Sequence, residues 1–331
     1  DNNYNALGSN LYGNFSISSI LIKTSFRDSN QYKSQTFQTF QNNRLIIANR
    51  LASINGNSNG DVDEDGFPQG YGKNNQSVLI PAFLSAYTGE NPENISLGAL
   101  RSTPLPNWSI QYTGLLNIEF FKERFKRFSL GHSYRSNYTL NNFKSNLEFN
   151  SSNNKITDLA GNFLNETLYT NINLVEQFNP LLKVDMELKN SVRVVLEMKK
   201  DRALSLSLDN NLLTEVSGMD YSIGLGYRIK DLKFRNSFGG KQSVSKGDLN
   251  IKADLSLRDN ITIIRNLDID DNKVTAGQSI WSLKFSADYA LSKSFNAVFF
   301  YDHLFSEFAI STAFPQTTIR SGMTLRYNFG E

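Results

Sequence analysis

The chain has 331 residues, with 34 Lys and Arg against 32 Asp and Glu, and no cysteine. The balanced charge excludes the basic surface that nucleic-acid binding needs, and the absence of thiols excludes disulfides, thiolate catalysis and cysteine-ligated metals. No run approaches about 18 consecutive apolar residues, which excludes a membrane-spanning helix. The 24 Phe and 14 Tyr, with a negative mean hydropathy, fit either a globular protein or a barrel with aromatic girdles around a polar interior.

The first expected element is a strand over Leu11–Arg27, and we assign residues 1–27 to a barrel strand. Residues 28–106 then lose the two-residue alternation of a strand, so we assign them to a loop and helical insertion outside the barrel wall. An Asp- and Gly-rich loop over 56–76 lies within this insertion.

Three short helices are expected. The segment 34–53 carries one apolar stripe, and VLIPAFLSAYTG has Pro81 near its start and Gly89 after its end. The third segment, NIEFFKERFKRF at 117–128, sets phenylalanines against basic residues. Such an amphipathic helix suits a membrane surface or the mouth of a barrel equally well.

The sequence DVDEDG opens like a calcium-binding loop, with Asp61, Asp63 and Asp65 before Gly66. The bidentate Glu that closes such a loop is absent, because its position holds Gly72. We therefore favour a solvated turn and keep the three aspartates as a weak calcium candidate.

From 107 to 331 the pattern predicts C-terminal barrel strands, which brings the total to about ten. FSLGHSYRSNYTL (128–140) alternates an apolar, ring-rich face with a small, polar face. Several runs keep this phase over about 18 to 20 residues, through KKDR, RDN or Pro180, whereas a typical globular strand has about 5 to 6 residues. The sequence therefore predicts an all-β, antiparallel, transmembrane fold, an outer-membrane β-barrel segment with a few short helices in its insertion.

Alternation gives each strand an apolar face and a polar face. The polar face is too bulky and charged for a packed core, so we expect it to face a barrel lumen and the apolar face to meet lipid. The lipid-facing candidates are Leu225, Tyr227, Trp281, Phe285 and Tyr289. The lumen-facing candidates are Arg228, Lys252, Asp254, Arg258 and Lys284.

If the C-terminus is periplasmic, the connections alternate between the two sides of the membrane. Those expected inside are Leu291–Ser294, Asp231–Gly247 and Lys189–Ser191, and those expected outside are Ser306–Gln316, Leu267–Gln278 and Asn150–Glu166. Two of the three inner connections are very short, as is usual for such barrels.

The last residues, RSGMTLRYNFGE, fit the C-terminal signal that the barrel-assembly machinery reads. The positions that carry this resemblance are Arg320, Gly322, Leu325, Tyr327 and Phe329. Gly330 and Glu331 follow the final aromatic residue, which departs slightly from the usual ending.

Catalysis would most plausibly use His132 or His303, and Asp302 adjoins His303. Neighbours on a strand point to opposite faces, so Asp302 and His303 cannot form a dyad without a bulge. The GLG at 224–226 lies inside a strand and opens no helix, so it is not a phosphate loop. We therefore expect that the chain is not an enzyme and that it binds no cofactor.

Long phrases spread in order over the chain carry a resemblance to a known family. They are VLIPAFLSAYTG, PNWSIQYTGL, LGHSYRSNYTL, EQFNPLL, LTEVSGMDYSIGLGYRIKD, DLNIKADLSLRDN and TAGQSIWSLKFSADYALS. Together they resemble the C-terminal part of the SprA/Sov family, the outer-membrane translocon of the type IX secretion system in gliding and pathogenic Bacteroidetes.

This resemblance implies a very large single-chain barrel to which the chain contributes the C-terminal strands. Folded cargo bearing a C-terminal sorting domain would cross it, and a PorV-like barrel protein and a periplasmic plug protein would be partners. Membrane lipid, lipopolysaccharide and, during assembly, the barrel-assembly machinery would also contact it. The alternative is a self-contained outer-membrane barrel, either a small-solute pore or a rim enzyme.

Overall fold

The structure is a computed structural model that describes residues 10–55, 60–150, 152, 155–238, 241–269, 271–292, 294–310 and 313–329. The side chains of 234–238 and 241–245 are not described. The beginning of the predicted 1–27 segment, part of the Asp- and Gly-rich loop, parts of several predicted connections and the last two residues therefore lie outside the described residues.

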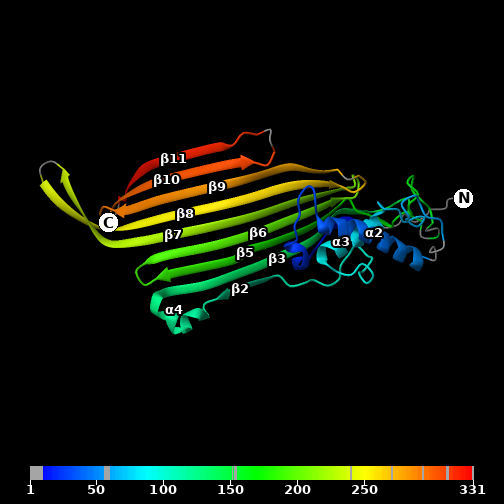
Figure 1. Cartoon of the computed structure of the whole chain (residues 1–331), viewed down its shortest axis with the longest axis horizontal. Helices are drawn as coiled ribbons and strands as arrows, with labels where there is room; N and C mark the ends of the chain where they lie inside the picture. The colour runs from blue at the N-terminus through cyan, green and yellow to red at the C-terminus, as the bar shows by residue number, and fades with distance from the viewer. Residues whose placement is uncertain are drawn as a thin grey trace.

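One antiparallel sheet of eleven strands dominates the described residues (Figure 1). The strands are β1 Tyr12–Ser18, β2 Trp108–Tyr112, β3 Phe125–Ser145, β4 Thr167–Leu168, β5 Asn171–Leu188, β6 Val192–Ser207, β7 Leu212–Phe238, β8 Lys241–Asn266, β9 Asn272–Ala290, β10 Phe295–Phe308 and β11 Gln316–Tyr327. The main path runs β1-β3-β5-β6-β7-β8-β9-β10-β11, with β2 and β4 paired to β3. The sheet is open: β1 and β11 lie at its two edges and do not pair with each other.

The long strands hold their phase as the alternation predicts. KKDR continues β6 and RDN continues β8, because both stretches stay hydrogen-bonded in register to β7. At Pro180, β5 advances four residues, from Phe178 to Leu182, while β6 advances only two. The two extra residues bulge out, and because their number is even, Phe178 and Leu182 stay on the same face.

The first strand ends earlier than predicted. The expected strand Leu11–Arg27 stops at Ser18, and Ile22–Ser25 forms the one-turn helix α1. Hydrogen bonds from distant parts of the chain pull the backbone out of the sheet: the Ser18 hydroxyl donates to the Leu105 carbonyl oxygen at 2.5 Å, and the Tyr134 hydroxyl accepts from Leu21 N–H at 2.8 Å.

The chain rejoins the sheet as β2. β1 pairs with residues 137–144 of β3 and β2 pairs with residues 130–134, both antiparallel. The two short strands therefore lie in one line along β3. They form a single edge strand interrupted by the residues from Ser19 to Asn107, which we call the insertion.

Two longer helices build the insertion, as the sequence predicts. In α2, Gln35–Ile54, the Ser34 hydroxyl caps the first turn by accepting from Phe37 N–H. α3, Gln76–Thr88, starts at the Asn75 cap and ends at Gly89, whose φ of 73° is the left-handed conformation typical after a helix. None of the helices in the described residues is long and apolar enough to cross a membrane.

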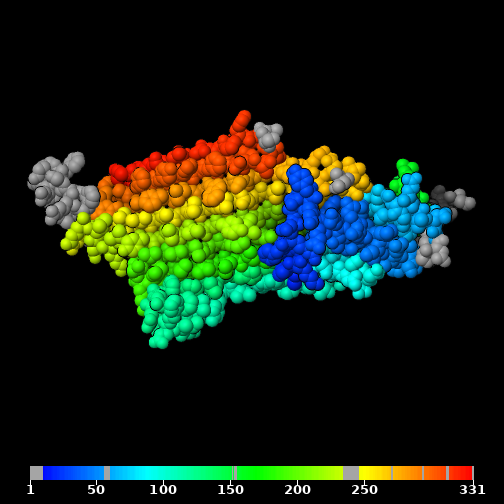
Figure 2. All heavy atoms as spheres, viewed as in Figure 1, coloured from blue at the N-terminus to red at the C-terminus, as the bar shows by residue number. Residues whose placement is uncertain are grey.

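The insertion packs on one end of one face of the sheet (Figures 1 and 2). Phe40, Ile47, Phe83 and Tyr87 from the helices are buried together with apolar side chains of the sheet. The sheet side chains in this cluster are Tyr138, Leu140, Ile172, Leu174, Leu204, Leu206 and Leu213. Part of the apolar face is therefore covered by the chain's own insertion.

The segment 117–128 forms a shorter helix than its pattern predicts. The helix α4 spans only Glu119–Arg124, after a 3-10 turn at Gly114–Asn117, and Phe125 already begins β3. The rings of Phe121, Phe125 and Phe128 pack edge-on or tilted with centroids 4.9 to 5.8 Å apart. Pairing of β3 with β5 thus overrides the local helical pattern.

Candidate functional site

The insertion leaves the rest of this face of the sheet uncovered (Figure 2). This uncovered part carries a belt of large apolar side chains, many of them exposed. On three neighbouring strands it runs from Tyr221 to Ile229, from Leu249 to Leu257 and from Trp281 to Tyr289, and register pairs these strands residue by residue. Leu225 and Trp281 each keep 48% of their surface exposed although they lie mid-strand. An apolar patch of this kind marks a membrane or protein contact rather than a water-facing surface. We call it the apolar belt.

The height of the belt matches a bilayer. Each of the three runs is nine residues long. At about 3.3 Å per residue this is about 30 Å of strand, or about 23 Å across the membrane for a tilt of about 40°. Transmembrane strands need about 9 to 11 residues.

Aromatic side chains line both ends of the belt. At the insertion side, Tyr221, Trp281 and Phe305 belong to one row of paired residues that crosses β7 to β10. At the other side, Tyr289 is the last but one residue of β9, and the Phe295 ring lies 6.2 Å from that of Tyr327. Aromatic rings at both interfaces are typical of outer-membrane strands.

The five lipid-facing candidates all lie on this belt face, although not all are equally exposed. Tyr227 is exposed, whereas Phe285 and Tyr289 are half-buried. The Tyr289 hydroxyl donates to the Leu232 carbonyl oxygen at 3.0 Å, and the Phe285 ring contacts that of Phe299.

The opposite face carries the five lumen-facing candidates and a series of ion pairs, most of them between neighbouring strands. Arg228 pairs with Asp248, and Asp254 lies directly opposite Lys284 in the register of β8 and β9. Lys252 and Arg258 share this face by alternation. Further pairs on this face include Arg127–Asp185, Arg193–Asp185, Lys183–Glu197, Arg320–Asp302 and, within β6, Lys199–Glu197. One sheet thus separates an apolar surface from a charged one.

Glycines of β7 leave room for this charged face. A Cβ at Gly224 would lie 2.9 Å from the Asp254 carboxylate, and one at Gly218 would lie 2.6 Å from that of Asp201. Gly224 of the GLG sequence therefore leaves space for the Asp254 side chain on this face.

Beneath the insertion, two buried ion pairs interrupt the apolar face. Glu176 and Arg202 are opposite each other on β5 and β6, 3.2 Å apart and at most 6% exposed. Ser25 and Tyr134 donate to the Glu176 carboxylate, while the Arg202 guanidinium donates to the Thr24 carbonyl and hydroxyl oxygens at 3.1 and 3.0 Å. This pair joins α1 to the sheet.

The second pair is formed by Glu215 of β7 and Arg265 of β8, also 3.2 Å apart and at most 4% exposed. The Ser29 hydroxyl donates to Glu215 at 2.8 Å, and Arg265 donates to the Ser29 hydroxyl and to the Asn30 carbonyl oxygen at 2.8 and 3.0 Å. Both pairs hold the segment after β1 against the apolar face.

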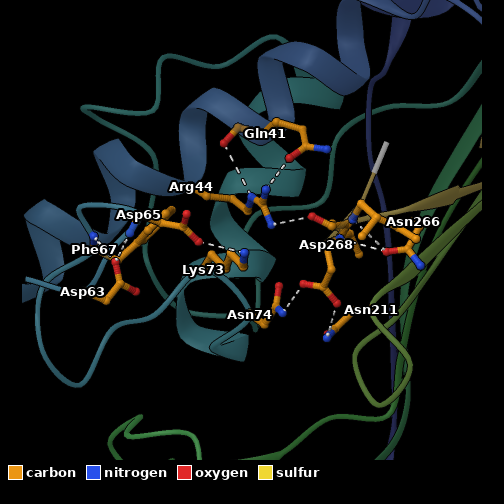
Figure 3. A network of polar contacts seen from close by, with 12 residues as sticks. Gln41, Arg44, Asp63, Asp65, Phe67, Lys73, Asn74, Asn211, Asn266 and Asp268 are labelled. Carbon is orange, nitrogen blue, oxygen red and sulfur yellow. Dashed lines mark hydrogen bonds and ion pairs between the residues drawn. The ribbon is translucent and has the colours of Figure 1, made fainter. Parts of the chain in front are cut away.

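The outer side of the insertion meets the β8–β9 connection through a polar network (Figure 3). Arg44 donates to Gln41 and, at 3.3 Å, to the Leu267 carbonyl oxygen. The Asp268 carboxylate instead accepts from Asn74 and Asn211. Burial lowers the pKa of the Arg44 guanidinium, and the nearby Asp268 and Asp65 partly oppose that shift.

Asp61, Asp63 and Asp65 do not converge on one point. Asp63 accepts from the N–H groups of Asp65 and Phe67, at 3.0 and 2.8 Å, and closes a turn (Figure 3). Asp65 pairs with Lys73 at 2.7 Å, and this hydrogen bond holds the Asp65 pKa below its ordinary value. Across the described ranges, no group of three or more His, Asp or Glu side chains lies close enough to hold a metal ion.

The five assembly-signal residues lie in or just after β11, at the sheet edge. Arg320 pairs with Asp302 of β10 at 3.0 Å, and a Cβ at Gly322 would lie 2.8 Å from the Phe300 ring. Leu325 and Tyr327 are exposed, and Phe329, which follows the strand, packs edge-on against Tyr327.

Among the described residues, no ion pair joins either histidine to a carboxylate. His303 shares the belt face, whereas Asp302 points to the other face and is paired with Arg320. The His132 Nδ1 lies 2.7 Å from the Leu181 carbonyl oxygen, beside the Trp108 ring.

Sequence reasoning missed the buried ion pairs, although a signal was present. Glu176, Arg202, Glu215 and Arg265 all stand at apolar-face positions of otherwise apolar runs. Charges at the buried phase of a strand indicate a covering element with polar groups.

The chain matches no protein-family model, and no curated protein sequence matches it.

Proposed function

We propose that this chain forms part of the wall of a large outer-membrane β-barrel that conducts folded proteins to the cell surface, as in the SprA/Sov-type translocon of the type IX secretion system. The main support for a membrane location is the exposed apolar belt, nine residues high, on a sheet whose other face is charged. In a bilayer the belt would meet lipid and the charged face would line an aqueous channel.

The open sheet supports a wide channel. Nine strands follow one another along the main path without curling back to pair β1 with β11. Barrel diameter grows with strand number, and a folded cargo needs a far wider channel than about ten strands can enclose. The remaining wall would come from strands outside this chain, and the PorV-like barrel, the plug protein and the sorting-domain cargo follow from the resemblance.

The transport role needs no chemistry from the side chains described above. The proposal is a passive conduit, with energy supplied by other components. The self-contained barrel is the alternative, and it would require the two sheet edges to meet.

Cysteine labelling tests the assignment of the two faces. The chain has no native cysteine, so single replacements at Leu225, Phe285, Asp254 and Lys284 introduce the only thiols within it. In intact outer membranes we expect a membrane-impermeant thiol reagent to modify positions 254 and 284 and to spare 225 and 285. Ready modification at 225 with protection at 254 would invert the assignment and remove the basis of the proposal.

Refolding distinguishes the large barrel from the self-contained one. We expect residues 1–331 alone in detergent to give no monodisperse, protease-resistant barrel, because closure would crowd Arg228, Lys252 and Asp254 into a narrow interior. Supplying the remainder of the protein should restore a resistant species. A stable closed barrel from the segment alone would favour the small pore.

A further inference from the structure

The short helix α4 lies at the end of the sheet opposite the insertion (Figure 1). The backbone N–H of Lys189 donates to the Arg124 carbonyl oxygen at 3.2 Å, so the end of α4 lies beside the connection from β5 to β6. This connection is one of those expected on the periplasmic side. In the proposed wall, α4 therefore stands at the periplasmic end.

The helix packs on the belt face of the sheet. The centroid of the Phe121 ring lies 4.9 Å from that of Phe128 in β3. Phe128 and Leu225 belong to one row of directly paired residues, which crosses β3, β5, β6 and β7. Directly paired residues share a face of the sheet. In a barrel wall, α4 would thus lie on the lipid side and not in the barrel mouth.

Large apolar side chains around α4 are exposed. Ile118 and Phe120 keep 50% and 55% of their surface exposed, and Tyr112 of the neighbouring β2 keeps 52%. Tyr112 pairs with Leu130, two residues along β3 from Phe128, so it also lies on the belt face. The exposed apolar surface of the belt face therefore continues to α4 at the edge of the sheet.

Two basic side chains of α4 have no acidic partner. Across the described ranges, no ion pair within 4 Å involves Lys122 or Arg124. The Arg124 guanidinium lies 4.0 Å from the centroid of the Phe120 ring and donates to the Phe120 carbonyl oxygen at 3.4 Å. A guanidinium has five N–H donors in one plane, so stacking on a ring leaves its edge able to bind an anion.

The charges of α4 are sorted around the helix axis. At about 100° per residue, Glu119 and Glu123 point about 160° away from Phe121, which contacts the sheet. Lys122 and Arg124 lie about 100° and about 60° from Phe121, on its two sides. The acidic side chains therefore point away from the sheet, and the basic ones flank its apolar contact. Basic side chains in this place extend their charge to the membrane interface while their stems cover apolar surface.

We propose that α4 is an interfacial anchor that gathers anionic phospholipids of the periplasmic leaflet, with lipid phosphates at Lys122 and at Arg124. The acyl chains would lie over Ile118 and Tyr112 and continue along the belt. This inference rests on the proposed function, because the orientation of the wall places α4 at the phospholipid leaflet. The phosphate accepts charge-assisted hydrogen bonds from either basic group.

Quenching by brominated lipid tests the position of α4. The full-length protein carrying Ile118→Cys, Glu123→Cys or Leu225→Cys is labelled with a small fluorophore, and the protein without these replacements gives the background. Vesicles contain phosphatidylethanolamine and phosphatidylglycerol with bromine on the acyl chains. We expect the label at 118 to be quenched about as strongly as that at 225. The label at 123, on the other side of α4, should be quenched at least about twofold less. Equal, weak quenching at 118 and 123 would overturn the proposal.

Lipid preference tests the two basic side chains. With bromine on only one of the two lipids, quenching of the label at 118 reports which lipid gathers at α4. We expect phosphatidylglycerol to be enriched about two- to fivefold over phosphatidylethanolamine. Lys122→Gln with Arg124→Gln should bring this ratio close to one. Lys252→Gln with Arg258→Gln removes two positive charges from the opposite face and is the matched control, expected to keep the ratio. Protease resistance establishes that each variant is folded.

The outcomes separate the anchor from the proposed function. Quenching at 225 without quenching at 118 would overturn the anchor and leave the membrane assignment intact. If position 118 were then also protected from a thiol reagent in intact cells, a protein partner would cover this surface instead. A ratio unchanged by Lys122→Gln with Arg124→Gln would overturn the role of the two basic side chains. Absence of quenching at 225 would overturn the membrane assignment itself, and the anchor with it.

Discussion

Individual charges on the apolar face have two different roles. Glu176 and Arg202 are buried beneath the insertion and hydrogen-bonded to α1, whereas Asp259 of β8 is exposed on the same face, beside the belt. All three interrupt the same alternation, and the sequence gives no sign of which is covered. That distinction depends on where α2 and α3 pack on the sheet, which is a matter of tertiary structure. Alternation alone places Leu225 and Lys284 on opposite faces of the sheet, because this property depends only on the strand itself.

Arg202→Met should loosen the insertion from the sheet. The Glu176 carboxylate would stay buried with only Ser25 and Tyr134 as donors, and removing one partner of a buried pair costs about 3–5 kcal/mol. The expected result is faster proteolysis within residues 19–107 while the strands stay resistant.

Lys199→Met is the control for Arg202→Met, because Lys199 lies three residues away on the same strand, on the opposite face, and is partly exposed. Combining Arg202→Met with Glu176→Leu should recover much of the resistance, since no uncompensated charge remains. Wild-type resistance in the single variant would show that the pair does not hold the insertion.

At the scale of elements, periodicity predicts where the strands lie. It does not predict a strand end that is determined by contacts with distant parts of the chain. The phase through Pro180 and the KKDR stretch is visible in sequence because alternation is a local property. The end of β1 at Ser18 is not visible, because Leu105 and Tyr134 determine it from far along the chain. The open sheet is likewise a matter of which strands pair, and composition does not encode that.

Gly247→Ala should disturb the end of the β8–β9 pairing. A Cβ at this position would lie 1.7 Å from the Ala290 carbonyl oxygen, so the β9 backbone would have to move. Overpacking of this kind costs about 1–3 kcal/mol. The temperature at which the folded band disappears in a semi-native gel should therefore fall.

Gly226→Ala is the matched comparison, since the nearest atom to its Cβ would be in ordinary contact at 3.7 Å. An equal effect of the two alanines would contradict the argument from close backbone approach at Gly247.

At the scale of the whole molecule, the sheet has two kinds of edge. One is β11, which pairs only with β10 among the described strands and carries the assembly-signal residues. The other is the interrupted line of β1 and β2. An unpaired edge is strongly disfavoured in hydrocarbon, so both would need partners in a membrane.

Deleting Arg320–Glu331 should abolish assembly rather than only reduce secretion. The deletion removes most of β11 and leaves β10 as an edge in the bilayer, where backbone groups have no water to bond. Outer-membrane fractions should then lack the protein, while an unrelated outer-membrane protein in the same cells stays at its normal level. Normal amounts of the truncated protein would refute the role given to this strand.

The interrupted edge strand allows the insertion to vary independently of the rest of the sheet. Ser18 and Trp108 lie opposite Asn137 and Tyr134, only three positions apart on β3, although 89 residues separate them in the chain. A segment that leaves and re-enters a sheet at neighbouring points changes neither strand order nor register. Such a segment can grow, shrink or be exchanged over evolutionary time while every other strand keeps its partners. The insertion and the rest of the sheet can therefore diverge at different rates.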